Sequence, residues 1–393
     1  MTTWPTVTLG EVAHFVRGVT FKPSDVGVGA ETVPVMRTKN VQALLDQDDV
    51  IRIPKRLVRR PDQFLRVGDT LISSANSWNL VGKCCWVPDL SEQTAIGGFV
   101  VSLRPNPKLV YPRFLYHWFA SPRIQAEVRG MANSTTNISN LPIGRCEGLP
   151  LHLPPIEEQR RIAAILDHAN SLRLKREQTM DLLRSIEEAA VERVVSFGRG
   201  TVQLGLIAEV RTGPFGSLLH KEDYVDNGVP LINPMHISDG QIVPNPKFTV
   251  SPDKASSLDR YRLRVRDVVM GRRGEMGRCA VVGPDEAGFL CGTGSLIVRP
   301  VEDRVRPTFL KMLLSSRAVV QALEARALGV TLPNLNTKIV ESLPVPDVDM
   351  TRQARLETLL IDIGRARSLR AEAQMRLDAL FTSLQARAFS GRL

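Results

Sequence analysis

The sequence predicts an α+β protein that arose by tandem duplication of one unit. That unit is a mixed α/β globular domain followed by a long helix, and the two helices pair as an antiparallel coiled coil. Two observations lead to this fold class. Short motifs return along the chain at an almost constant offset. Each set of motifs ends in about 40 residues whose apolar positions follow the period of a helix. A length of 393 residues is ample for two such copies.

The repeated motifs define the length of the duplicated unit. The tetrapeptide Val-Thr-Leu-Gly at 7–10 returns as Val-Gln-Leu-Gly at 202–205, an offset of 195 (202 − 7 = 195). The same offset relates Gly82-Lys83-Cys84 to Gly277-Arg278-Cys279, Arg104-Pro105 to Arg299-Pro300, and Pro112-Arg113-Phe114-Leu115 to Pro307-Thr308-Phe309-Leu310. Leu149-Pro150 returns as Leu343-Pro344 at an offset of 194. A period this long exceeds the roughly 20–50 residues of solenoid repeats, so it indicates duplication of a whole domain.

The first part of each copy has the composition of a globular domain. It is rich in Gly and Pro, which separate short β-like runs as strands and turns require. Helical patches that begin at Pro112 and Pro307 interrupt these runs, and proline suits the first turn of a helix. We therefore expect mixed α/β domains at 1–152 and 198–346.

The second part of each copy, at 153–197 and 347–393, has the composition of a long helix. Ala, Leu, Ile, Arg and Glu dominate, and apolar residues recur at spacings of three and four. These positions stay apolar in both copies, so one helical stripe is preserved twice. The residues that we expect to pair the helices are Ile162, Leu166, Ala169, Leu183 and Ile186 in the first copy, and Leu356, Leu360, Ile363, Leu377 and Leu380 in the second.

Helices of this length need a partner along their whole extent. About 40 helical residues span roughly 60 Å, which is longer than a compact domain of this size. The expected partner is the other long helix in antiparallel orientation, with one globular domain at each end of the pair. The alternative is that each helix packs on its own domain.

The overall composition favours an acidic partner. The net charge of +10 is carried largely by arginine, whose planar guanidinium suits phosphate and guanine, so nucleic acid is the expected ligand. An Arg-rich chain from a GC-rich genome is the alternative explanation. The five cysteines (Cys84, Cys85, Cys146, Cys279 and Cys291) form no C-x-x-C pair, which argues against a zinc site or a disulfide framework and favours a reduced cytoplasmic protein. No apolar run approaches about 18 residues, so no contact with a membrane is expected.

Motifs that carry catalysis are missing from the sequence. It contains no G-x-x-x-x-G-K-[ST] phosphate loop, no H-E-x-x-H and no G-x-S-x-G. No lysine follows an Asp or Glu two residues earlier, as two-carboxylate nucleases require, and no Pro-Pro-Tyr motif of an amino-methyltransferase is present. The six histidines are scattered singly. We therefore expect a non-catalytic binding subunit with no metal and no cofactor of its own.

One stretch of the sequence resembles a known family. The run Leu-Pro-Pro-Ile-Glu-Glu-Gln-Arg-Arg-Ile-Ala-Ala-Ile-Leu-Asp at 153–167 is similar to the start of the conserved helical region in specificity subunits of type I restriction–modification systems. The segments 137–139 and 149–151 before it, and the terminal Phe-Ser-Gly-Arg-Leu at 389–393, are also similar to that family. The second copy departs from the pattern: Pro154-Pro155 becomes Asp347-Val348, and only Gln353 keeps the glutamine of Gln159.

The resemblance implies a function and a set of partners. Each globular part would be a target recognition domain that reads one half of a split site in double-stranded DNA, and the coiled coil would set the spacing between the halves. Two methyltransferase (M) subunits, which carry S-adenosylmethionine, would dock on this chain, with motor–nuclease restriction (R) subunits as an optional further partner. Two other interpretations stay open: the recognition subunit of another phage-defence DNA methylation system, and a non-DNA coiled-coil adaptor.

Two polar loops at corresponding places in the copies are the candidate DNA readers, at 73–79 and 271–275. The candidate DNA-binding residues are Ser73, Asn76, Trp78, Asn79 and Lys83 in the first copy, and Arg272, Arg273 and Arg278 in the second. Arginine can bind guanine and asparagine can bind adenine through paired hydrogen bonds, whereas Lys83 and Arg278 suit phosphate. Trp78 would stack on a base or pack in the core. Solvated hairpin tips are the alternative, and Asn137 and Asn334 are expected to cap or turn the chain towards the helices.

Overall fold

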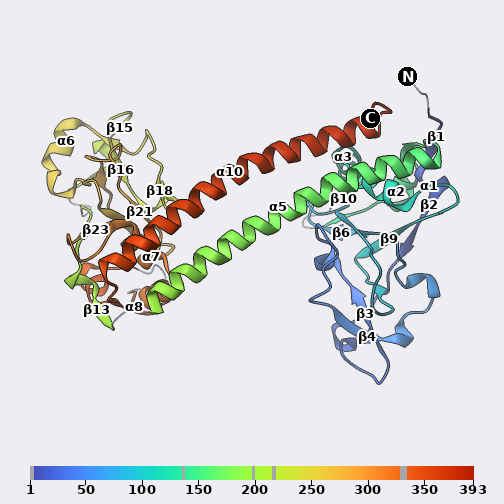
Figure 1. Ribbon diagram of the computed structural model, residues 1–393, viewed down its shortest axis with the longest axis horizontal. Helices are drawn as coiled ribbons and strands as arrows, with labels where there is room; N and C mark the ends of the chain where they lie inside the picture. Colours follow the sequence, from blue (N-terminus) through green and yellow to red (C-terminus); the bar gives the residue numbers. More distant parts are fainter. Residues whose placement is uncertain (1–3, 135–137, 197–199, 215–217, 328–333) are drawn as a thin grey trace. The chain divides into compact units, whose positions relative to one another are not determined.

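The computed structural model describes residues 4–134, 138–196, 200–214, 218–327 and 334–393, and it divides into two compact units (Figure 1). Unit 1 comprises Met1–Gln178 and Arg370–Leu393, and unit 2 comprises Thr179–Leu369. Each unit therefore holds one globular part and a segment of each long helix. In the described ranges, no helix combines the length and apolar character that crossing a lipid bilayer requires.

The globular part of unit 1 is built on an antiparallel sheet of four strands. Its strand order is β2 (Ala13–Arg17), β9 (Val100–Pro105), β5 (Thr70–Ser73) and β7 (Cys84–Trp86). Successive strand residues point to opposite faces, so neighbours on β5 enter different cores. Ile72 packs with Phe114 beneath helices α2 (Pro112–Phe119) and α3 (Pro122–Met131). Leu71 packs on the other face with Met36 of a second sheet.

That second sheet is small and mixed. Its central strand β3 (Thr32–Met36) runs antiparallel to β4 (Ile51–Pro54) and parallel to β8 (Ala95–Ile96). After β2 the chain leads to the second sheet. On the way, Val19 forms a β-bridge with Gly97, the residue after β8. A Cβ atom added to Gly18 would lie 1.8 Å from the carbonyl oxygen of Gly97, so only glycine permits this approach. Gly213 makes the corresponding approach to Gly292 in unit 2.

Unit 2 repeats this architecture. Its four-stranded sheet has the order β14 (Ala208–Thr212), β23 (Ser295–Pro300), β20 (Val268–Gly271) and β21 (Cys279–Val281), and it packs on α7 (Pro307–Ser315) and α8 (Arg317–Arg326). Its second sheet has the order β15 (Tyr224–Val225), β19 (Thr249–Val250), β16 (Val229–Ile232) and β22 (Leu290–Cys291). Unit 2 adds the hairpin β17 (Ile237–Ser238) and β18 (Gln241–Ile242), and helix α6 (Pro252–Ser257).

The repeated motifs occupy the same structural positions in both units. The first motif lies at strand β1 (Thr6–Thr8), which pairs with β12 (Pro150–His152), and again at β13 (Thr201–Gln203), which pairs with β24 (Pro344–Pro346). Short helices follow or precede these pairs: α1 (Leu9–Val12), α4 (Ile143–Glu147) and α9 (Thr337–Glu341). The repeated glycines Gly82 and Gly277 adopt φ angles of 80° and 79°, a left-handed turn that favours glycine.

The repeated arginines form ion pairs with buried aspartates. Arg104 Nε donates to Asp69 Oδ1 at 2.9 Å, and Arg299 Nε donates to Asp267 Oδ1 at 2.7 Å. In each pair a second bond joins Nη2 to Oδ2, at 2.6 Å and 2.8 Å respectively. Both aspartates are about 1% exposed. The duplication has therefore kept a charge-assisted, two-pronged contact at the same place in each sheet.

The glutamine of the family-like motif joins each long helix to its globular domain. Gln159 Oε1 accepts from the backbone N–H of Tyr111, the residue before α2, at 2.7 Å, while its Nε2 donates to Pro154 O at 2.8 Å. Gln353 Oε1 accepts from Arg306 N, the residue before α7, at 2.8 Å. Both side chains are about 1% exposed. This buried contact explains why glutamine stays in the second copy although the Pro-Pro step does not.

In unit 1 the two long helices pair in antiparallel orientation. Helix α5 (Ile156–Ser196) and helix α10 (Met350–Ala388) contribute their first and last parts to this unit. Arg173 Nε donates to Asp378 Oδ1 at 2.6 Å, and Arg161 Nη2 donates to Leu393 O at 3.1 Å. Ile162, Leu166 and Ala169 share one core with Phe381 and Ala388.

Unit 2 contains a matching antiparallel pair. Arg367 Nη1 donates to Glu187 Oε2 at 2.8 Å. Leu356 and Leu360 of α10 join the same core as Ala190 and Val194 of α5. In both units the helices also pack on their domain, so the two packing arrangements considered from the sequence occur together. The predicted fold class is confirmed, whereas the four-segment division at 1–152, 153–197, 198–346 and 347–393 stays a prediction.

The buried part of the helical stripe is narrower than its period suggests. Ile162, Leu166, Ala169, Leu356 and Ile363 are buried, and Leu183, Leu360 and Leu377 are half-buried. Ile186 and Leu380, however, are 42% and 53% exposed. Two paired helices cover only a narrow face of each other, so apolar residues at the margin of the stripe remain in contact with solvent.

Candidate nucleic-acid interface

The candidate reader loop of unit 1 is joined to a second segment of the chain. Strand β6 (Ala75–Asn76) pairs with β11 (Ser139–Asn140), which pairs with β10 (Asn133–Ser134). Leu141 N also donates to Ser74 O at 2.8 Å. The sequence pattern predicted only 73–79 at this surface and did not indicate 133–134 and 139–141, because no local pattern reports a contact across about 60 residues.

The five candidate residues of this loop differ in their exposure. Ser73 is about 1% exposed, and its Oγ accepts from Asn76 Nδ2 at 3.1 Å. This bond fixes the base of the loop and holds the Asn76 amide. Trp78 is 56% exposed and Asn79 is also exposed, so both can meet a ligand. Lys83 Nζ donates to Gln42 Oε1 at 2.6 Å.

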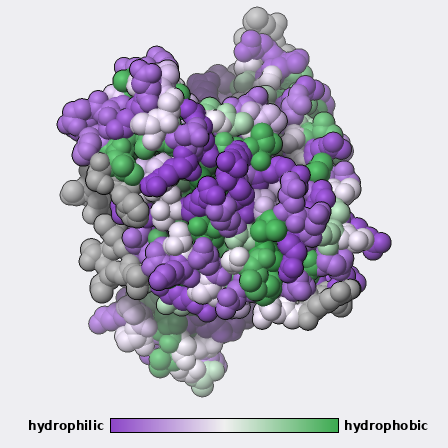
Figure 2. Space-filling model, turned by 90° about the vertical axis from the view of Figure 1, so that its left-hand side faces the viewer, coloured by the Kyte–Doolittle hydropathy of each residue, from purple (hydrophilic) through white to green (hydrophobic). Residues whose placement is uncertain are grey.

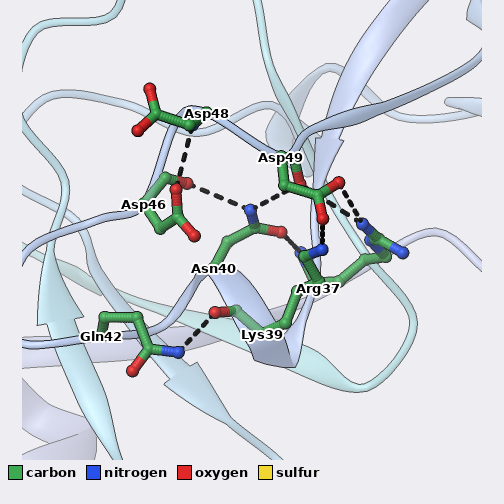
Figure 3. Close-up of polar contacts among 7 residues, drawn as sticks. All are labelled: Arg37, Lys39, Asn40, Gln42, Asp46, Asp48 and Asp49. Atoms are coloured by element: carbon green, nitrogen blue, oxygen red, sulfur yellow. Dashed lines mark hydrogen bonds and ion pairs between the residues drawn. The ribbon is translucent and has the colours of Figure 1, made fainter. Parts of the chain in front are cut away.

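In the loop at 37–49, which Gln42 joins to Lys83, both cations are paired with a carboxylate of the same loop (Figure 3). Arg37 and Lys39 both form ion pairs with Asp49. Asn40, which is fully buried, donates to the carbonyl oxygens of Asp46 and Asp49 at 3.1 Å and 3.0 Å. Gln42 Nε2 donates to Lys39 O at 2.6 Å, so the partner of Lys83 belongs to the same network.

The candidate loop of unit 2 is joined to the chain in the same way. Leu335 N donates to Arg272 O at 2.9 Å, which matches the bond from Leu141 to Ser74, and Arg273 forms a bridge with Asn334. Asn334 was expected to cap a helix or turn the chain towards it; the cap itself is Asn336, whose Oδ1 accepts from Ile339 N at 2.9 Å. Asn334 lies two residues earlier, where the backbone is extended. Asn137 lies outside the described residues.

The arginines of this loop lie in different environments. Arg278 forms an ion pair with Glu275, and its Nη1 donates to Pro234 O at 3.3 Å. Arg273 is exposed, whereas Arg272 is only 6% exposed. Burial, together with the positive charge of Arg273, lowers the pKa of Arg272 below its ordinary value. Arg272 is thus a partly desolvated cation at the base of the loop.

Arg272 and Arg273 line an open cleft of about 690 Å³ in unit 2. The other lining residues are Pro214, Leu219, His220, Lys221, Tyr224, Lys247, Phe248 and Thr293. The rings of Tyr224 and Phe248 meet edge to face, with centroids 6.0 Å apart. Figure 2 faces unit 2 and shows a surface that is largely hydrophilic. The cleft therefore combines cations with an aromatic wall, which suits an anionic ligand that also has flat or non-polar parts.

The cationic and aromatic residues of this cleft other than the two arginines were missed from the sequence, among them Lys221, Tyr224, Lys247 and Phe248. Tyr224 lies in β15 of the second sheet of unit 2, and the other three lie just before β15 or β19, whereas Arg272 and Arg273 follow β20 of the first sheet. The only local signal was a lysine beside an aromatic residue at 247–248. Their approach to the arginines depends on how two sheets pack together.

The described residues give no sign of a metal centre. Among them, His, Cys, Asp and Glu side chains do not gather in groups of three or more that could hold a metal ion. All five cysteines are free thiols. Burial raises the pKa of Cys85 to about 12 and that of Cys146 to about 11, so these thiols are weak nucleophiles at neutral pH.

Comparisons with known proteins agree on one family. Residues 1–182 match the type I restriction modification DNA specificity domain. The chain is 22% identical over 425 residues to the type I restriction enzyme EcoKI specificity subunit of Escherichia coli K12, a match that covers 99% of this chain and 89% of that protein. It is also 22% identical over 428 residues to the EcoBI specificity subunit of Escherichia coli, covering 99% of this chain and 86% of that protein.

Solved structures show the same fold. The S subunit of a type I restriction–modification system from M. genitalium aligns with a TM-score of 0.56 and 15% identity, over 98% of this chain and 96% of that chain. A chain from a structural study of complex assembly in the type I R-M system aligns with a TM-score of 0.61 and 18% identity, over 100% and 99% of the two chains. The chain is thus similar over nearly its whole length to specificity subunits of type I restriction–modification systems, and its first 182 residues match their DNA specificity domain.

Proposed function

We propose that this chain is the DNA sequence-specificity subunit of a type I restriction–modification complex. Each unit reads one half of a bipartite, asymmetric site in double-stranded DNA. One observation carries the proposal. The candidate reader loops lie at corresponding points of the two four-stranded sheets, after β5 in unit 1 and after β20 in unit 2, but their side chains differ in charge. Ser74 and Ala75 of unit 1 stand where Arg272 and Arg273 stand in unit 2. Corresponding places with different side chains suit two different half-sites.

The direct test is selection of duplexes from a random pool by the full-length chain. We expect a split motif with two different halves separated by an unspecified spacer. The Arg272→Ala variant is expected to relax base preference in one half only, by about 5- to 150-fold, because one base-reading arginine is worth about 1–3 kcal/mol. The matched variant Asn79→Ala is expected to relax the other half.

The pattern of loss distinguishes base reading from other roles. Thermal melting of each variant checks that the fold is retained. If Arg272→Ala weakened binding to every duplex equally, the residue would contact phosphate and the reading role would be lost. A full-length chain that selects no motif, but still binds protein through its helices, would support the adaptor interpretation instead.

We propose further that two methyltransferase subunits, which supply S-adenosylmethionine, dock on the long helices, and that motor–nuclease subunits can join them. Ile186 and Leu380 support this proposal. They stand at corresponding positions of the two copies (380 − 186 = 194), one in each unit, and both remain exposed although apolar. A matched pair of exposed apolar residues suits two copies of one partner.

The number of bound partners tests this docking role. Ile186→Glu and Leu380→Glu are each expected to reduce the methyltransferase from two subunits to one per chain, and the double variant to lose both, because each glutamate adds a charge to an apolar contact. Native mass spectrometry of co-purified complexes measures the ratio. The exposed neighbour Arg184, replaced by glutamate, serves as the control. Two subunits retained by the double variant would rule out this surface.

A further inference from the structure

The cleft of unit 2 collects cations from three separate segments. Lys221 follows His220 and precedes β15, Lys247 lies just before β19, and Arg273 follows β20. All three side chains are exposed. Within the described part of the chain, none of the three forms an ion pair with a carboxylate, whereas nearby Lys254 is paired with Asp223 at 2.9 Å. Their charge is therefore available to a ligand.

The strand pairing of the second sheet identifies the corresponding residues of unit 1. In unit 1, β3 pairs in parallel with β8, and Val35 lies opposite Ala95. In unit 2, β16 pairs in parallel with β22, and Leu231 lies opposite Leu290, so Leu231 corresponds to Val35. On its other side, Val35 lies opposite Ile51 of the antiparallel strand β4. On the corresponding side of Leu231, its backbone N–H donates to Phe248 O. Phe248 therefore corresponds to Ile51, and Lys247 to Val50.

The other lining residues can be matched by their hydrogen bonds. His220 N bonds to Asp223 Oδ2 and Lys22 N bonds to Asp25 Oδ2, both at 2.7 Å. Lys221 therefore corresponds to Pro23, and Tyr224 corresponds to Val26.

The corresponding place in unit 1 is thus almost without charge. Four uncharged residues of unit 1 stand where unit 2 has two lysines and two arginines: Pro23, Val50, Ser74 and Ala75. The one cation that unit 1 adds here is Lys22, in place of His220. Arg52, a cation of strand β4 in this sheet, is paired: its two terminal nitrogens donate to Glu92 at 2.8 Å and 3.0 Å. The two units therefore share the backbone arrangement of this surface, but only unit 2 carries a cluster of cations on it.

We propose that the cleft of unit 2 binds the sugar–phosphate backbone of DNA beside the half-site that this unit reads, and that unit 1 has no corresponding phosphate site. Lys221 and Lys247 contact phosphates, Arg273 adds its charge beside them, and the wall of Tyr224 and Phe248 contacts the sugars. Buried Arg272 lies at the base of the cleft and belongs to the base-reading loop at 271–275. This inference rests on the proposed function and adds an asymmetry to it: one unit anchors the DNA by charge more strongly than the other.

The salt dependence of binding measures phosphate contacts. Each neutralised phosphate releases condensed counterions and makes the slope of log K against log salt steeper by about 0.9 on duplex DNA. The double variant Lys221→Ala/Lys247→Ala is therefore expected to make the slope shallower by about 1.8, as measured with the full-length chain on the selected duplex at several salt concentrations. Its preferred motif is expected to stay the same, because phosphate contacts carry no sequence information.

A control variant separates this effect from a general loss of charge. Arg317→Ala removes an exposed cation from α8, which lies well away from β15 within unit 2 (Figure 1), and is expected to leave the slope unchanged. If the cleft variant also kept the wild-type slope while still selecting the split motif, the cleft inference would be overturned and the proposed function would stand. If the wild-type chain selected no split motif, the proposed function would fail, and this inference with it.

Discussion

Replacing Asp267 by alanine is expected to destabilise unit 2 by about 3 kcal/mol, the lower end of the range for a buried pair, because it removes the counter-charge of Arg299, whose side chain is 17% exposed. Asp267 is about 1% exposed and accepts two hydrogen bonds from Arg299, and its Oδ2 also accepts from Arg264 N at 2.8 Å. Without the carboxylate, the Arg299 guanidinium would stay in the sheet without its ion-pair partner. Urea unfolding of the full-length chain, followed by circular dichroism, measures the loss.

Two further variants sharpen this test. Asp285→Ala removes an exposed aspartate from the same unit and is expected to change stability by less than about 0.5 kcal/mol. Asp69→Ala breaks the corresponding pair with Arg104 and is expected to destabilise unit 1 to a similar extent. If Asp267→Ala lost no more stability than Asp285→Ala, the repeated Arg-Pro motif would need an explanation other than the ion pair.

Lengthening both long helices is expected to lengthen the spacer of the DNA site. Seven residues inserted after Gln178 in α5 and seven before Ala373 in α10 lie five residues beyond each member of the Arg173–Asp378 pair, so the pairing register is kept. Seven helical residues add about 10 Å and nearly two whole turns, which corresponds to roughly three base pairs of duplex. Selection from a random pool, as for the wild-type chain, reads the new spacer directly.

The same selection contains its own control. A seven-residue insertion after Asp285, in an exposed turn of unit 2, is expected to leave the spacer unchanged. Both half-site sequences are expected to survive in the lengthened chain, because no reader residue has been altered. Unchanged spacing in the chain with two lengthened helices would remove the role of the helix pair in setting the distance between half-sites.

Much of the fold could be predicted because its signals are local. The predicted helical segments at 153–197 and 347–393 contain the observed helices Ile156–Ser196 and Met350–Ala388. Composition and the spacing of apolar residues predict a helix directly, because helix formation depends mainly on residues within a few turns of one another. The candidate site could be predicted only as far as its loops. Burial of Ser73 and Arg272 depends on the segments that pair with each loop, and neither sequence neighbourhood reports them.

The sequence by itself determined the duplication, the two long helices and the positions of two unequal loops. Motif offsets and helical periods are properties of the chain, and they survive whatever the tertiary packing. Only the tertiary structure decided that Lys221 and Lys247 face Arg273 across one cleft, that Gln159 and Gln353 tie helices to domains, and that Ile186 and Leu380 stay exposed. These features are contacts between segments far apart in the chain. They depend on how sheets and helices pack, because burial and proximity are set by that packing rather than by neighbouring residues.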